Sequence, residues 1–236
     1  MQPGVEMSES GRPSSDEGTR LLFSEATSAA GAVATIVICV LGSLSNVVTI
    51  LALALSSLRS HPTTLFVLSL AISDLIYSVY NMPLMAHRFL HRGCEYMCLD
   101  YHMCQYFPFF MFGNIGVSIW IMVLIALQRV FGVFRGHLLD RVFSRRRVVL
   151  MILAVWLLVF GGLYLPLTKT WGQFGYEPQT FSCTVVESEG ETFYPVMTAC
   201  GVGLPCCVIT LSYGAIWWKV KTRGQRCSQK FPFTRY

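Results

Sequence analysis

Five long stretches of this chain carry almost no ionised side chain. Four of them contain no Asp, Glu, Lys or Arg, and the other contains a single one, Asp74. A helix needs about 20 apolar residues to cross the hydrocarbon core of a membrane. All five stretches are long enough, so each predicts one membrane-spanning helix. They cover residues 26–58, 62–87, 101–128, 148–168 and 192–218.

Helices are favoured over strands in these stretches. Only helices and closed barrels satisfy their backbone hydrogen bonds in lipid, and the stretches lack period-two alternation and exceed the length of barrel strands. The chain is also 53% hydrophobic and only 13% charged, which excludes an ordinary soluble domain. We therefore predict an all-α fold, an integral membrane helix bundle. The expected helices are about 27–57, 63–87, 101–134, 147–168 and 192–220.

The polar ends of the chain complete the expected domain organisation. Residues 1–25 have the composition of a disordered segment and do not resemble a cleavable signal. The bundle is expected over residues 26–222, followed by a basic tail at 223–236. With the N-terminus outside, inner segments hold 12 Lys and Arg residues and outer segments 5. The positive-inside rule therefore predicts an extracellular N-terminus and a cytoplasmic tail.

Charge and motif content exclude several functions. The net charge of +5 lies mostly on the cytoplasmic rim beside the membrane, so lipid is an expected partner and nucleic acid is not. We find no nucleotide-binding loop and no nucleophile with a matching base. His87, His91 and His102 flank one outer loop, but they do not form a convincing metal-ligand pattern. We expect no enzymatic activity and no metal.

Polar residues within the spans point to function. Asp74 lies close to mid-membrane, where an ionised carboxylate costs about 2.5–3.5 kcal/mol. Such a residue turns away from lipid and is functional or paired; the alternative is a protonated Asp bonded to a neighbouring helix. Asn114 and Ser118 are four residues apart on one helical face, so they are candidate partners.

The third span has a cysteine near one end and an arginine near the other. Cys104 and Arg129 are 25 residues apart, or about 37 Å along a helix. Arg129 could be a boundary anchor whose stem lies along apolar surface. Cys94, Cys98, Cys104 and Cys183 lie in outer segments, where disulfides are permitted.

Several motif residues follow one another in a fixed order over residues 29–222. They are Asn46 in "GSLSNVVTILALAL", Asp74 in "LSLAISDLIYSVYNMP", Cys104 and Arg129 at a separation of 25, Trp156, Pro166, Cys183, Pro205 and Tyr213. This order and these spacings resemble a rhodopsin-like (class A) G-protein-coupled receptor. The "QRV" at Gln128 and the inner segment "HLLDRVFSRRR" are similar to melatonin-receptor-like and related invertebrate orphan receptors.

This resemblance implies ligand-driven signalling to a heterotrimeric G protein at the plasma membrane. It implies a disulfide between Cys104 and Cys183, and a switch in which Arg129 meets the G protein as Tyr213 turns toward it. In most members of the family an acidic residue before this arginine pairs with it in the resting state. Gln128 stands in that position and is uncharged, so the resting state should be less stable and basal activity appreciable.

The same resemblance implies a sodium site and an apolar ligand pocket. Asp74, Asn114 and Ser118 would hold sodium in the inactive receptor, which is the only cofactor expected. Met111 stands where amine receptors carry an aspartate. The candidate pocket residues Phe107, Met111, Met197 and Gly201 favour a lipid-like, aromatic or hydrophobic peptide ligand over a monoamine. The alternative is that these apolar residues face lipid or neighbouring helices.

The sequence departs from the family after the fifth span. No helix-six or helix-seven motif follows, so we expect a fragment, a truncated isoform or an incomplete gene model. Two alternatives to a signalling receptor stay open. One is a five-span membrane protein with no receptor role, and the other is a truncated isoform that modulates a full-length receptor.

Overall fold

The computed structural model describes residues 24–57, 61–90, 101–177, 182–186 and 192–230. Among them are five helical segments long and apolar enough to cross a membrane, which confirms the predicted all-α bundle. Most of residues 1–25 lie outside the described part, whereas the last helix continues to Lys230, into the expected tail. The five segments are Glu25–Leu55, Pro62–Leu90, His102–Phe134, Arg145–Leu167 and Phe193–Arg223.

Helix ends follow local chemistry. Ser24 precedes the first helix in an extended conformation, and its hydroxyl accepts a hydrogen bond from the Thr27 N–H at 3.2 Å. The second helix begins at Pro62, where a backbone N–H would have no partner. The helical elements are α1 (Glu25–Leu55), α2 (Pro62–Ile76), η2 (Tyr77–Asn81), α3 (Met82–Leu90), α5 (Tyr101–Phe134), α6 (Gly136–Val142), α7 (Arg145–Leu167), α8 (Phe193–Thr198), η3 (Ala199–Gly203) and α9 (Leu204–Lys230).

Two spans contain a π-helical turn just before a proline, where we expected uninterrupted helix. Pro83 follows η2 closely and Pro205 follows η3. In a regular α-helix, a proline ring clashes with the carbonyl four residues earlier. A single wider π-helical turn relieves this crowding, and within it a backbone N–H bonds to the carbonyl five residues earlier. Each span therefore continues past its proline. The donor and acceptor are Met82 and Tyr77 in η2, and Leu204 and Ala199 in η3.

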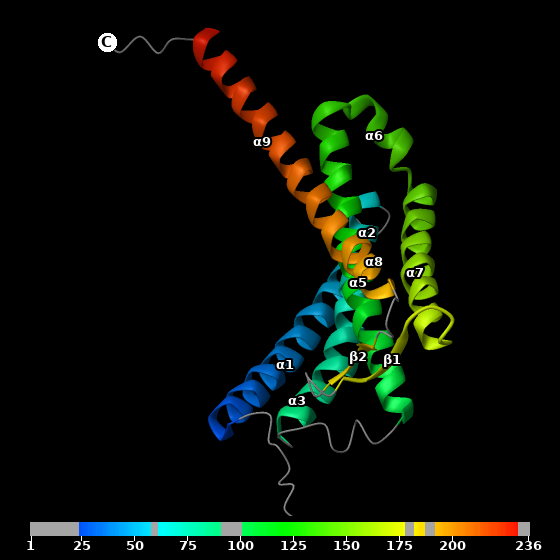
Figure 1. Cartoon of the computed structure of the whole chain (residues 1–236). Helices are drawn as coiled ribbons and strands as arrows, with labels where there is room; N and C mark the ends of the chain where they lie inside the picture. The colour runs from blue at the N-terminus through cyan, green and yellow to red at the C-terminus, as the bar shows by residue number, and fades with distance from the viewer. Residues whose placement is uncertain (1–23, 58–60, 91–100, 178–181, 187–191, 231–236) are drawn as a thin grey trace, which may run out of the picture.

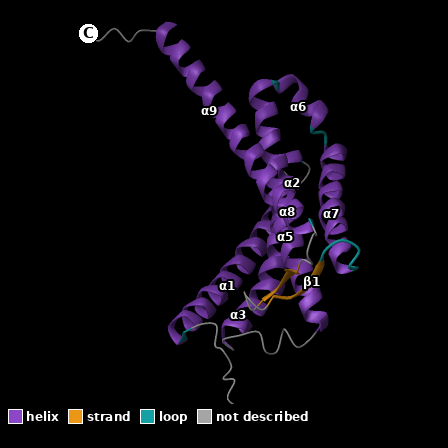
Figure 2. Cartoon of the chain, viewed as in Figure 1, coloured by secondary structure: helices purple, strands orange, loops and turns teal. Residues whose placement is uncertain are grey.

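A β-hairpin, which the sequence did not predict, lies at one end of the bundle (Figures 1 and 2). Strands β1 (Gln173–Glu177) and β2 (Ser182–Val186) are antiparallel, with Tyr176 opposite Cys183. Buried Phe174 and Val185 pack with residues of α7 and α8. The short helix α6 lies at the opposite end of the bundle (Figure 1).

Helix α5 is the centre of the bundle and packs against α2, α7 and α9, while α1 packs against α2 and α3 (Figure 1). Two glycines allow α7 to approach α5 closely. A Cβ at Gly113 would collide with the Phe160 ring, and one at Gly116 would lie 2.9 Å from Val159. The main buried cluster includes residues of α2, α5 and α7. Its members are Phe66, Val117, Ile121, Phe143 and Val148.

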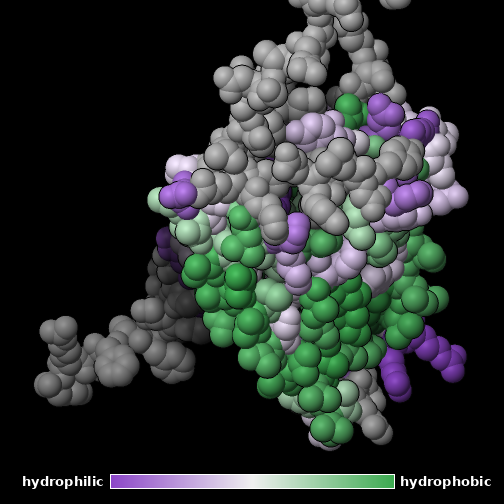
Figure 3. All heavy atoms as spheres, turned by 90° about the horizontal axis from the view of Figure 1, so that it is seen from below, coloured by the Kyte–Doolittle hydropathy of each residue, from purple (hydrophilic) through white to green (hydrophobic). Residues whose placement is uncertain are grey.

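The outer surface of the bundle is apolar. Val48 and Leu41 of α1 are 64% and 61% exposed, and Leu158 of α7 is 76% exposed. Figure 3 views the molecule from the hairpin end and shows hydrophobic residues over a broad continuous area. Exposed side chains of this kind are favourable in lipid and unfavourable in water, so this surface is the one that faces the membrane.

Candidate functional site

A polar contact joins α2 to α5 inside the membrane-spanning region. The Ser118 hydroxyl donates a hydrogen bond to Asp74 Oδ1 at 2.8 Å, and the Asp74 side chain is half-buried. One turn further along, the Ser78 hydroxyl donates to the Asp74 backbone carbonyl. The carboxylate is therefore held toward α5 rather than toward lipid.

Asn114 lies beside this contact but bonds differently. The Ser73 hydroxyl is 3.3 Å from Asn114 Oδ1 and 3.1 Å from the Asn114 carbonyl oxygen. The Asn114 amide nitrogen donates to the Phe110 carbonyl at 2.8 Å. The structure thus brings Ser118 to Asp74 and Asn114 to the preceding Ser73. Asn114 is one helical turn from Ser118, which places it level with a different residue of α2.

Trp156, a motif residue of the fourth span, has a partner that the sequence did not reveal. Its indole N–H donates to the Ser69 hydroxyl at 3.1 Å, and its ring stacks on Phe160 with centroids 5.7 Å apart. This bond ties α7 to α2 close to the glycine contact with α5. Asn46, by contrast, donates to the Gly42 carbonyl within its own helix.

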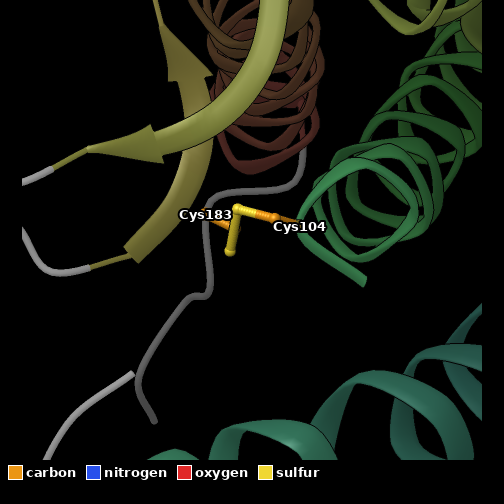
Figure 4. The surroundings of a disulfide bond; sticks show 2 residues. All are labelled: Cys104 and Cys183. Atoms are coloured by element: carbon orange, nitrogen blue, oxygen red, sulfur yellow. A yellow bond between two sulfur atoms is a disulfide. The ribbon is translucent and has the colours of Figure 1, made fainter. Parts of the chain in front are cut away.

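The disulfide between Cys104 and Cys183 is confirmed (Figure 4). It joins the hairpin-side end of α5 to strand β2, with a Cα–Cα distance of 5.0 Å. Both cysteines are buried, so the crosslink fixes the hairpin over that end of the bundle. Cys94 and Cys98 lie outside the described residues.

The four candidate pocket residues fall into separate environments. Phe107 is buried beside the disulfide and Met111 packs against the same cluster. Met197 packs instead against the cluster that contains Phe174 of the hairpin. Gly201 lies in η3, and a Cβ there would meet no described atom within 4 Å. Among the described residues, these four positions therefore do not belong to one buried cluster.

The three predicted switch residues differ in exposure and in their contacts. Arg129 is exposed and makes no hydrogen bond or ion pair within the described part of the chain. Gln128 is only 6% exposed, and among the described residues its Oε1 has no hydrogen-bond partner. Tyr213 is 52% exposed because the neighbouring Ser212 occupies the buried face of α9. Adjacent residues of a helix point about 100° apart, so Gln128 faces the interior of the bundle while Arg129 is exposed.

Two residues that the sequence did not single out have notable positions. Lys219 of α9 donates to the Val133 carbonyl at 2.8 Å and lies 4.0 Å above the Phe134 ring. Asn81 is fully buried at the end of η2, and neither polar atom of its side chain has a hydrogen-bond partner among the described residues. The sequence offered one signal for Asn81, because it places an amide side chain within an apolar stretch. It offered none for Lys219, which the sequence does not distinguish from the other basic residues at the cytoplasmic end.

The fold and these contacts define a multi-pass membrane protein built around a central helix with polar contacts in its interior. Comparison with known proteins then identifies the family. The model of the family "7 transmembrane receptor (rhodopsin family)" matches residues 45–235. The chain therefore belongs to the rhodopsin family of seven-transmembrane receptors.

Several curated relatives are similar over most of this chain. "Protein trapped in endoderm-1" of Drosophila melanogaster is 34% identical over 200 residues, 84% of this chain and 50% of that protein. "G-protein coupled receptor moody" of the same fly is 28% identical over 86% of this chain and 30% of that protein. "Melatonin receptor type 1A" of Mus musculus is 27% identical over 78% of this chain and 50% of that protein. The chain thus spans half or less of the length of these relatives.

Proposed function

We propose that this chain acts in ligand-driven signalling to a heterotrimeric G protein. The observation that carries the proposal is the hydrogen bond from Ser118 to Asp74, within a bundle of the rhodopsin family. A carboxylate held between two helices at mid-membrane responds to any change in their relative position. Such a contact couples the arrangement of helices to what the bundle binds.

The G-protein contact in this proposal is Arg129. Its exposure at the end of the bundle opposite the disulfide leaves the guanidinium accessible to a partner. Tyr213, also exposed, turns toward Arg129 in the active state. Gln128 carries no charge to hold the arginine at rest, so the resting state is weakly favoured and basal signalling is appreciable.

Asp74 and Ser118 form the core of the proposed sodium site. Sodium is a hard cation that prefers oxygen ligands, and the carboxylate and hydroxyl oxygens here converge within 2.8 Å. Asn114 supplies a further oxygen close by, although Ser73 now engages it. Bound sodium would stabilise the inactive arrangement and oppose agonist binding. The alternative is a protonated Asp74 whose bond to Ser118 only joins the helices.

The ligand in this proposal is apolar or aromatic and not a monoamine. Met111 and Phe107 line the disulfide end of α5 and provide no carboxylate for an ammonium group.

The membrane in this proposal is the plasma membrane. The N-terminus lies outside, because this orientation places most basic residues at the cytoplasmic face.

The test expresses the receptor encoded by the complete transcript that contains this chain and measures G-protein activation in cells. Activation above that of cells without receptor supports the proposal. Loss of this activation in Arg129→Ala, with unchanged surface expression, assigns it to the proposed contact. Activation that is absent under every ligand class tested, together with absent basal activity, would contradict signalling.

A second candidate function is modulation of a longer receptor by this chain. The exposed apolar face of α9, which includes Leu211, Trp217 and Trp218 at 73%, 61% and 65% exposure, favours it. Co-expression of the chain with its longer relative would lower the surface amount of that receptor. Unchanged surface amounts would argue against modulation.

A further inference from the structure

The face of α7 that points away from the bundle carries a row of exposed side chains along the whole span. Leu150, Leu153 and Leu157 are 63%, 52% and 73% exposed, and Tyr164 is 58% exposed. Arg146 begins the row and is also exposed. These residues follow Arg146 by 4, 7, 11 and 18 positions, so all five share one side of the helix. The row is about 27 Å long, close to the hydrocarbon thickness of a bilayer.

No element in the described part of the chain covers this row of side chains. A Cβ at Gly161, between Leu157 and Tyr164 on the same side, would meet no described atom within 4 Å. The opposite side of α7 packs on α5 through Val159, which lies against Gly116. The row therefore faces the acyl chains of the membrane.

Positive charge gathers at the Arg146 end of the row. Within residues 135–147, Asp140 is the only acidic residue. The exposed cations there are Arg135, Arg141, Arg145, Arg146 and Arg147. Three of them occupy the first turn of α7, where the helix dipole already disfavours positive charge. A nearby anion would offset this repulsion.

We propose that this face of α7 binds an anionic phospholipid, with its phosphate at Arg146 and an acyl chain along Leu150, Leu153 and Leu157. A guanidinium matches the oxygens of a phosphate group with paired hydrogen bonds. The leucines match an acyl chain and would give nothing to a soluble phosphate. Anionic lipids are enriched in the cytoplasmic leaflet, which is the leaflet at this end when the N-terminus is outside.

This site is independent of G-protein signalling, so its test measures lipid directly. The purified 236-residue chain is mixed in detergent with equal phosphatidylserine and phosphatidylcholine, and native mass spectrometry measures the lipid retained. We expect preferential retention of phosphatidylserine. Arg146→Gln should lower this retention about fivefold, which corresponds to about 1 kcal/mol for one arginine at an anionic surface. Arg146→Lys, which retains the charge, should preserve most of it.

Two matched variants distinguish binding along the leucine row from a general effect of positive charge. Arg141→Gln removes an exposed arginine of α6 that is not aligned with the leucines, and retention should stay at the unmodified value. Leu153→Ser should lower retention although every arginine is present. Circular dichroism of each variant verifies that its helix content is unchanged.

Four outcomes would overturn the proposal. The first is equal retention of phosphatidylserine and phosphatidylcholine, and the second is an equal loss of lipid retention in Arg146→Gln and Arg141→Gln. The third is displacement of the lipid by soluble glycerophosphoserine. The fourth is a dimer of the chain that is present in the unmodified protein and absent in Leu153→Ser. The third outcome would assign the site to a free phosphate group. The fourth would assign the row to a second copy of the chain.

Discussion

The ammonium nitrogen of Lys219 in α9 lies 2.8 Å from the carbonyl oxygen of Val133 in the last turn of α5. The last carbonyls of a helix lack partners within the helix, and a cation near them is favourable. The same nitrogen lies over the ring of Phe134. Lys219 therefore ties α9 to α5 one turn beyond Arg129, at the end where we propose that the G protein binds.

Lys219→Met should loosen this tie, because methionine retains the apolar stem and loses the charged donor. We expect a lower midpoint of thermal unfolding and a changed basal G-protein activity, and Lys219→Arg should restore both. Lys221→Met is the matched control, since Lys221 lies over Trp217 of its own helix and does not link two helices. Equal effects of Lys219→Met and Lys221→Met would show that the contact with Val133 contributes nothing specific.

Asp74→Asn should remove the sodium response of the receptor. In the unmodified receptor, agonist affinity should fall as sodium replaces choline at constant ionic strength, because sodium and agonist favour different states. The asparagine retains an oxygen for Ser118 but has no negative charge for a cation. Radioligand competition measures the effect. A sodium dependence that persists in Asp74→Asn would remove Asp74 from the proposed site.

Gln128→Asp should lower basal activity. A carboxylate next to Arg129 would add a charged hydrogen bond worth about 1 kcal/mol more than a neutral one, which is about fivefold in the resting-to-active ratio. Gln128→Asn, which shortens the side chain without adding charge, is the control. Basal G-protein activation normalised to surface expression is the measurement. Unchanged basal activity in Gln128→Asp would show that charge at this position does not hold the arginine.

Asn81→Leu should stabilise the bundle. An amide without partners in a buried site costs about 1–3 kcal/mol, and leucine has the same number and branching of side-chain heavy atoms, none of them polar. We expect a higher midpoint of thermal unfolding in detergent. Ser78→Ala provides the contrast, because the Ser78 hydroxyl is bonded to the Asp74 carbonyl. A lower midpoint in Asn81→Leu would indicate that a buried water or another group satisfies the amide.

Cys104→Ser should destabilise the hairpin end of the molecule. The disulfide closes a separation of 79 residues, and loss of such a crosslink costs about 2–4 kcal/mol. Cys183→Ser should have the same effect, and the double variant should be no worse than either single one. Non-reducing peptide mapping identifies the pair directly. Free thiols at both positions in surface-expressed protein would contradict the pairing.

Hydropathy alone predicts the number of spans and the fold class. The five apolar stretches correspond to the five membrane-length helices among the described residues, because each helix must be apolar over most of its length to cross the hydrocarbon core, whichever helices it packs against. Motif order was sufficient to suggest the receptor family and the Cys104–Cys183 pair. Neither source predicted the hairpin or the π-helical turns before Pro83 and Pro205, whose geometry depends on backbone crowding within each turn.

The partners of individual polar groups depend on the packed bundle. Spacing placed Asn114 and Ser118 on one helical face, and the family resemblance grouped them with Asp74. Asn114, however, bonds to Ser73, and of the two it is Ser118 that reaches Asp74. Which side chains meet is decided by the rotation and separation of neighbouring helices, and these follow from close contacts such as Gly113 against Phe160. Spacing along one helix identifies a shared face but does not determine which residue of another helix lies opposite it. For the same reason the contact between Lys219 and Val133, 86 positions apart, became visible only once α9 lay against α5.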